Sequence, residues 1–181
     1  MPSLEPREVE FSRVVNVGAL GETELIREIA AGIEERVALA KRFGLVSIGC
    51  LSAAFRLKRV GDGTFSLTCR LRADVVQECV VSLAPVEACI EESFAATYVR
   101  SSVSTGERVV SLSVEANDPP EAITSDEIDV GEAVAQQLGV LLEPYPRAPG
   151  ASIDHLAPNE PGSAPAEGPF AALAELKRRL R

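Results

Sequence analysis

The residues whose spacing most clearly suggests chemistry are four basic side chains around a short glycine-rich segment. Arg56 and Lys58 precede Gly61-Asp62-Gly63, and Arg70 and Arg72 follow it. If this segment is a tight hairpin turn, all four basic side chains share the solvent face of one hairpin. The expected pairing sets Val60 opposite Thr64, Lys58 opposite Ser66, Arg56 opposite Thr68 and Ala54 opposite Arg70.

This basic patch has two interpretations. It could bind phosphate groups of a nucleic acid, because such binding depends on lysine and arginine. It could also be an ordinary solvated sheet face, since long basic side chains commonly decorate exposed strands and discourage edge-to-edge association of sheets. The sequence favours the second interpretation on general grounds and leaves the first open.

No catalytic constellation is recognisable in the chain. It has no G-x-S-x-G elbow, no G-x-x-x-x-G-K phosphate loop and no H-E-x-x-H. The only histidine, His155, lies in a proline-rich tract where nothing would hold it as a base. The acidic pairs Glu34-Glu35 and Glu91-Glu92 and the cluster at 126–129 are best explained as solvated faces. We therefore expect no enzymatic activity, no cofactor, no metal and no small-molecule substrate.

The four cysteines do not form a metal-binding pattern. Cys50, Cys69, Cys79 and Cys89 contain no C-x-x-C pair, which gives a zinc site or a redox dithiol little support. In a reducing compartment they are expected to be small core residues.

Charge and length limit the class of protein. The 181 residues suffice for one domain with a real core, and the net charge of −9 with a pI near 4.8 argues against broad nucleic-acid binding. Any nucleic-acid contact must therefore be local. The N-terminus lacks the features of a secretory signal, and no run is long enough to cross a bilayer. We expect a cytoplasmic protein with no membrane partner.

The middle of the chain alternates with a period of two. Residues 64–75 alternate without a fault, and a bulge near Cys50 and Leu51 would keep the preceding apolar residues inward. Further strands are expected over 9–17, after Pro85, and around Val110, Leu112 and Val114. Short connections imply antiparallel neighbours. The predicted fold class is α+β, with a twisted antiparallel sheet of about four to six strands, curling toward a barrel as a variant, flanked by helices.

Two segments have a helical period. Residues 22–43 carry an apolar stripe that ends at Gly44; the half from Ile33 to Phe43 is the clearer helix, and residues 22–31 form either a separate helix or a loop. Asp129 and Glu132 resemble a capping box for a second helix, which must stop before Pro144.

The C-terminal region changes in composition. We expect residues 1–147 to form a single domain, 148–168 a flexible linker rich in proline and glycine, and 169–181 a short basic amphipathic helix. From Phe170 to Arg181 there are four basic residues and one acidic residue on an otherwise acidic chain. The candidate docking residues are Phe170, Leu173 and Leu176, together with Tyr145 and Arg147 in the preceding extended connector, and the added candidate RNA contacts are Lys177, Arg178 and Arg179.

Three motifs in fixed order resemble a known family. They are the segment from Gln77 to Val86, the segment from Ile128 to Ala151 that contains Asp129-Val130-Gly131-Glu132, and the closing residues 169–178. Together they resemble the YceD-like family of large ribosomal RNA subunit accumulation proteins, in the form of its alphaproteobacterial-type bacterial branch. Many relatives carry C-x-x-C where this chain has Cys79-Val80-Val81-Ser82, so a metal or redox role does not carry over.

The resemblance implies a cytoplasmic, non-enzymatic factor for ribosome biogenesis that supports accumulation of large-subunit (23S) ribosomal RNA. Two mechanisms are compatible with it. In the first, the protein binds ribosomal RNA or a particle that precedes the large subunit. In the second, it is an acidic adaptor or chaperone for a basic ribosomal protein.

Overall fold

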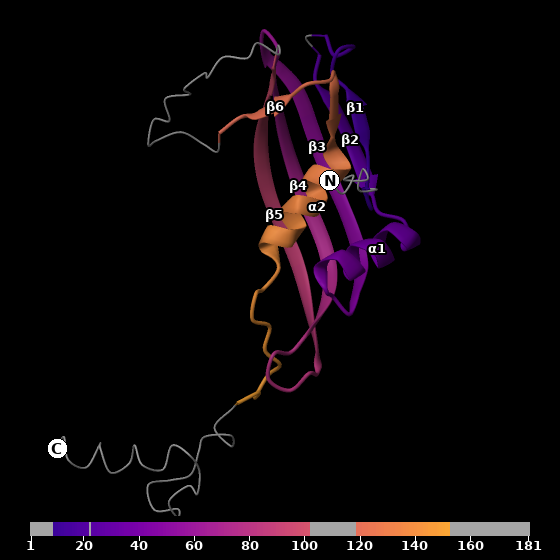
Figure 1. The fold of residues 1–181 in the computed structure, drawn as a ribbon, viewed down its shortest axis with the longest axis vertical. Helices are drawn as coiled ribbons and strands as arrows, with labels where there is room; N and C mark the ends of the chain where they lie inside the picture. Colours follow the sequence, from indigo (N-terminus) through magenta and orange to yellow (C-terminus); the bar gives the residue numbers. More distant parts are fainter. Residues whose placement is uncertain (1–8, 22, 102–118, 153–181) are drawn as a thin grey trace, which may run out of the picture. The chain divides into compact units, whose positions relative to one another are not determined.

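The strands and helices are described for residues 9–21, 23–101 and 119–152 in a computed structural model of the chain (Figure 1). Three long strands dominate the fold. The elements in chain order are β1 (Val14–Asn16), β2 (Leu25–Ala30), α1 (Ile33–Phe43), β3 (Ser47–Gly61), β4 (Thr64–Glu78), β5 (Pro85–Arg100), β6 (Glu121–Ile123), β7 (Glu127–Asp129) and α2 (Val130–Leu141).

The main sheet has five strands in the order β2-β3-β4-β5-β6. Its first four strands are antiparallel neighbours, whereas β6 runs parallel to the end of β5. A second, two-stranded sheet pairs β1 with β7. The α+β class and the mostly antiparallel sheet are confirmed. Within the described residues the sheet stays open, so the barrel variant is wrong.

Both helices pack on one face of the main sheet. The core joins Leu39 and Ala40 of α1 and Val134, Ala135 and Leu138 of α2 to the inward residues of β3 and β4. Those inward residues alternate along each strand, as a sheet with one buried face requires. We call the face under the helices the inner face and the opposite one the outer face. The inward residues of β3 and β4 include Leu51, Phe55, Leu57, Phe65, Leu67, Leu71 and Val75.

Two segments differ from the expectations. Residues 25–30 form the edge strand β2, not a helix or a loop, because their pairing with β3 buries Leu25 and Ile29 partly on the inner face. The strand expected over 9–17 is reduced to β1. The strand expected around Val110, Leu112 and Val114 lies outside the described residues.

The β3–β4 register confirms most of the expected pairs. Arg56 lies opposite Thr68, Lys58 opposite Ser66 and Ala54 opposite Arg70. The pair of Val60 with Thr64 is wrong, because Gly61 takes that position and a register shift follows Arg59. The predicted bulge is also present, between Ile48 and Cys50, which keeps Ile48 and Leu51 buried but turns Cys50 toward Asp74.

The helix ends follow the sequence signals. α1 ends at Gly44, whose positive φ of 66° suits glycine, and α2 ends before Pro144. Asp129 caps α2 by accepting the N–H groups of Gly131 and Glu132, while the Glu132 carboxylate pairs with Arg42. A Cβ on Gly131 would lie 2.6 Å from the carbonyl oxygen of Phe11. This glycine lets the N-terminal segment pass close to α2.

The regions expected as linker and terminal helix lie almost wholly outside the described residues, so their boundaries remain predictions. No helix in the described part is long and apolar enough to span a membrane.

Candidate functional site

The fold brings four of the predicted site residues together. Arg56 and Lys58 on β3 and Arg70 and Arg72 on β4 alternate with buried residues, so all four are exposed on the outer face. We call these four residues the outer basic face. Because β3 and β4 are paired over nearly their full length, the spacing of these four side chains is fixed by backbone hydrogen bonds.

Carboxylates already contact three of the four cations. Arg56 lies 3.4 Å from Glu24, and Arg70 and Arg72 each lie 3.5 Å from Glu91. The arginine side chains are 54% to 73% exposed, and exposed pairs of this kind stabilise a protein by only about 0 to 1 kcal/mol. A phosphate group could therefore replace these carboxylates at small cost. Lys58 has no ion-pair partner among the described residues.

A shallow depression of about 460 Å³ lies beside these arginines. Its floor is made of small side chains on β3, Ser52 and Ala54, and Arg70 and Arg72 border it. None of the described outward residues of β2 to β5 is aromatic. The described part of this face therefore offers no aromatic platform on which bases could stack.

The cysteines divide into two kinds. Cys69 and Cys79 are buried, as expected, but Cys50 is half-buried and Cys89 is exposed on the outer face, in one row with Asp74. The Cys50 thiol donates a hydrogen bond of 3.1 Å to Asp74, which lowers the pKa of that carboxyl, whereas burial raises the pKa of Cys50. No cluster of His, Cys, Asp and Glu in the described ranges could hold a metal ion.

Cys79 has a role that the sequence analysis missed. Its sulfur accepts N–H groups from Ala148 at 3.2 Å and from Val81 and Ser82 at 3.4 Å. The Ala148 N–H and the Ser82 hydroxyl and N–H stabilise the thiolate and lower the pKa of Cys79 to about 6. Ser82 thus supports the Cys79 sulfur as a hydrogen-bond donor.

These bonds join two of the three motifs that carry the family resemblance. Val80 N–H donates to the carbonyl of Pro146, and the Gln77 side chain donates to the carbonyl of Glu143, both at 2.9 Å. We call the turn at 79–84 and the connector at 143–148 the connector clamp. The order of the motifs along the chain indicates that they act together, but their contact depends on the fold.

The clamp also determines where two predicted docking residues lie. Tyr145 and Arg147 are exposed, and Pro146 between them is buried. Both lie far along the sequence from the residues of the outer basic face. The remaining predicted site residues lie outside the described part of the chain: Phe170, Leu173, Leu176, Lys177, Arg178 and Arg179.

The chain is an α+β protein with an open sheet, and no described helix covers the outer face that carries the four basic side chains. Residues 67–177, more than half of the chain, match the family described as large ribosomal RNA subunit accumulation protein YceD. The chain belongs to this family, whose name connects its members with the accumulation of large-subunit ribosomal RNA. Comparisons with curated proteins and with solved structures found no match.

Proposed function

We propose that the protein is a cytoplasmic, non-enzymatic factor that supports accumulation of 23S ribosomal RNA by contacting the RNA backbone on a particle that precedes the large subunit. The observation that carries this proposal is the outer basic face, where four cations stand at fixed spacing on a sheet surface that no helix of the described residues covers. Family membership supplies the ribosomal context.

The proposed contact is local and electrostatic. Weak, exposed pairs with Glu24 and Glu91 hold the arginines, so phosphate groups can compete for them. A face without aromatic side chains favours recognition of backbone shape over base identity. Lys177, Arg178 and Arg179 are proposed as a second basic contact, with Phe170, Leu173 and Leu176 docking on the assembling particle.

RNA binding as a function of salt tests the outer basic face. Binding of large-subunit RNA fragments should weaken with salt, and the double variant Arg70→Gln/Arg72→Gln should reduce the log-log slope by about 0.7 to 0.9 for each phosphate that it no longer neutralises. The matched control is Arg36→Gln/Lys41→Gln on α1, which removes the same charge far from β4 in the sequence. Glu91→Gln should increase affinity, because it frees both arginines. No binding, or an equal decrease in the control, would exclude this mechanism.

Association with the particle is tested separately by co-sedimentation with large-subunit precursors, using the full chain and a form without residues 169–181. The expected result is co-sedimentation that weakens when the tail is removed. If the protein co-sediments equally well without residues 169–181 and with Arg70 and Arg72 substituted, both proposed contacts are rejected.

A second candidate function, an acidic adaptor for a basic ribosomal protein, is favoured by a different observation. The chain has 27 acidic and 18 basic residues, and several carboxylates gather along β5 at Glu87, Glu91 and Glu92. On this mechanism the basic partner would be a protein, and the arginine variants above would leave the association with precursors unchanged.

A further inference from the structure

The edge of β5 that faces away from β4 is paired over only a short part of its length. β4 pairs with β5 continuously from Val99 to Pro85, without a register shift, but on the other side β6 pairs only with residues 98–100. Among the described strands, residues 85–97 therefore have no partner on that side. No described strand pairs with the backbone donors and acceptors along this part of the edge. Residues 86–97 contain no lysine, proline or bulge, and the charged side chains on this part of the strand are all carboxylates: Glu87, Glu91 and Glu92. Such charges disfavour pairing with a like-charged strand.

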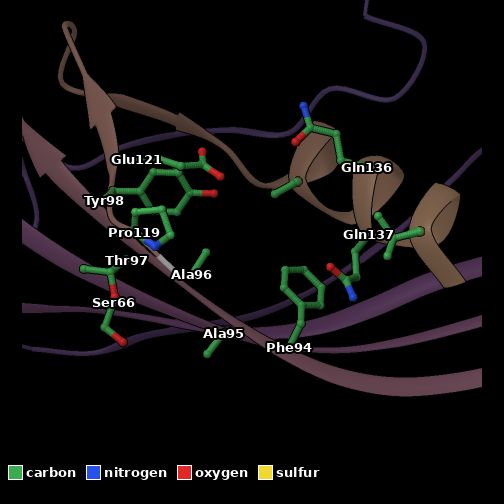
Figure 2. A pocket seen from close by; sticks show the side chains of 12 residues that line it. Ser66, Phe94, Ala95, Ala96, Thr97, Tyr98, Pro119, Glu121, Gln136 and Gln137 are labelled. Atoms are coloured by element: carbon green, nitrogen blue, oxygen red, sulfur yellow. The ribbon is translucent and has the colours of Figure 1, made fainter. Parts of the chain in front are cut away.

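A groove of about 730 Å³ runs along part of this edge (Figure 2). Residues from Phe94 to Tyr98 line one side, and Gln136, Gln137 and Val140 of α2 line the other. Val140 is 78% exposed and Phe94 is only partly buried, so the groove has apolar surface that no described residue covers. An extended chain added to β5 would place alternate side chains over this surface.

One carboxylate, Glu121, lines the groove, and a second, Glu92, lies on β5 close to the lining residue Phe94. Glu92 lies on the same strand face as Phe94, two residues earlier, and Glu121 lies beside Tyr98 (Figure 2). Within the described part of the chain, neither carboxylate forms an ion pair. Burial, with a smaller contribution from the Glu121 charge, raises the pKa of Tyr98 to about 12. Glu87 and Glu91 add negative charge on the opposite face of β5.

The carboxylates on and near β5 favour some binding partners of its edge over others. A second copy of β5 would bring like charges together across the new strand pair, which is destabilising. A basic strand would place lysine or arginine opposite the same carboxylates, which is favourable. RNA would be repelled by the edge for the same reason that it is attracted to the outer basic face.

We propose that the β5 edge binds an extended segment of a basic protein by strand addition, with an apolar side chain between Phe94 and Val140 and basic side chains near Glu92 and Glu121. This inference deepens the second candidate function, since it names the surface and the partner chemistry. It does not depend on RNA binding, because the outer basic face and this edge use different residues.

Three synthetic peptides of about eight residues test the proposal on the full chain. In the first, a central leucine and the lysines two positions to either side of it point to one face, and threonine fills the other positions; the second has the same sequence with every other backbone amide methylated; the third replaces lysine with glutamate. We expect only the first to bind in fluorescence anisotropy, because methylation removes the donors that pair with a strand edge. Binding should slow amide hydrogen exchange between Phe94 and Thr97.

Two pairs of variants locate the binding. Glu92→Gln/Glu121→Gln should weaken the lysine peptide about three- to tenfold, while Glu28→Gln/Glu34→Gln, which removes equal charge from β2 and α1, should leave it unchanged. Val140→Ser should weaken it, and the control Val37→Ser, at another exposed helix position, should not. RNA affinity of Glu92→Gln/Glu121→Gln should not fall, which separates this site from the outer basic face.

Several outcomes would overturn the inference. They are equal binding of the methylated or glutamate peptide, equal weakening in the control variants, and slow exchange of the β5 edge amides in the free protein, which would mean that the chain itself covers the edge. Self-association through β5 in sedimentation equilibrium would assign the edge to a second copy instead.

Discussion

The two faces of β4 differ in burial along nearly the whole strand. Leu71 is fully buried under the helices, whereas the next residue back, Arg70, has a side chain that is 73% exposed. The same backbone hydrogen bonds position both residues. The inner face of β4 therefore contributes buried side chains to the core, and its outer face presents charged side chains. Substitutions on the two faces should change the free energy of unfolding to different extents.

The largest expected effect is on the inner face. Leu71→Ala removes a side chain with 0% exposure and leaves a cavity, so we expect the free energy of unfolding to fall by about 2 to 5 kcal/mol. Urea unfolding should show a lower midpoint with an unchanged slope. A decrease below about 1 kcal/mol would contradict the division between the faces.

The next effect concerns the contact between α2 and residues 11–13. Gly131→Ala would place a Cβ 2.6 Å from the Phe11 oxygen and 2.8 Å from the Arg13 nitrogen. Both are backbone atoms and cannot rotate away from the new methyl group. We therefore expect the free energy of unfolding, measured by thermal unfolding, to fall by about 1 to 3 kcal/mol. Gly21→Ala is the control, since a Cβ at this position would meet no atom within 4 Å. The free energy of unfolding of this variant should not fall.

A smaller, pH-dependent effect is expected at the connector clamp. Because the folded protein lowers the pKa of Cys79 from 9.0 to about 6, the thiolate stabilises the fold fully above pH 9, and this contribution disappears as pH falls through 6. The difference in unfolding free energy between the native chain and Cys79→Ala should therefore grow from pH 6 to pH 9.

Cys69→Ala is the control for that measurement. Burial raises the pKa of Cys69 from 9.0 to about 11, so the difference between the native chain and Cys69→Ala should not grow between pH 6 and 9. A constant difference for Cys79→Ala as well would show that Cys79 is not a thiolate in the fold.

The smallest effect is expected on the outer face. Arg70→Ala removes an exposed side chain whose ion pair is 3.5 Å long, so the free energy of unfolding should change by less than about 0.5 kcal/mol. The same urea titration used for Leu71→Ala gives the comparison directly. A decrease comparable to that of Leu71→Ala would mean that the outer face is structural and not available for binding.

The sequence alone determined the α+β class, the long hairpin and the face on which Arg56, Lys58, Arg70 and Arg72 lie. These follow from local signals: a period of two along β4, a glycine-rich turn, Gly44 after α1 and Asp129 before α2. The face to which a side chain in a strand points depends only on whether its position is odd or even and on the pairing register. No tertiary information was therefore needed to place the four cations together.

Only the tertiary structure decided the rest. Residues 25–30, expected in a helix or a loop, form β2 because they pair with β3, and the clamp joins Cys79 to Ala148 across 69 positions. The parallel pairing of β6, the open edge of β5 and the groove beside α2 depend on which strands become neighbours. Neighbour choice is set by the packing of the whole core, and no short segment of sequence contains it.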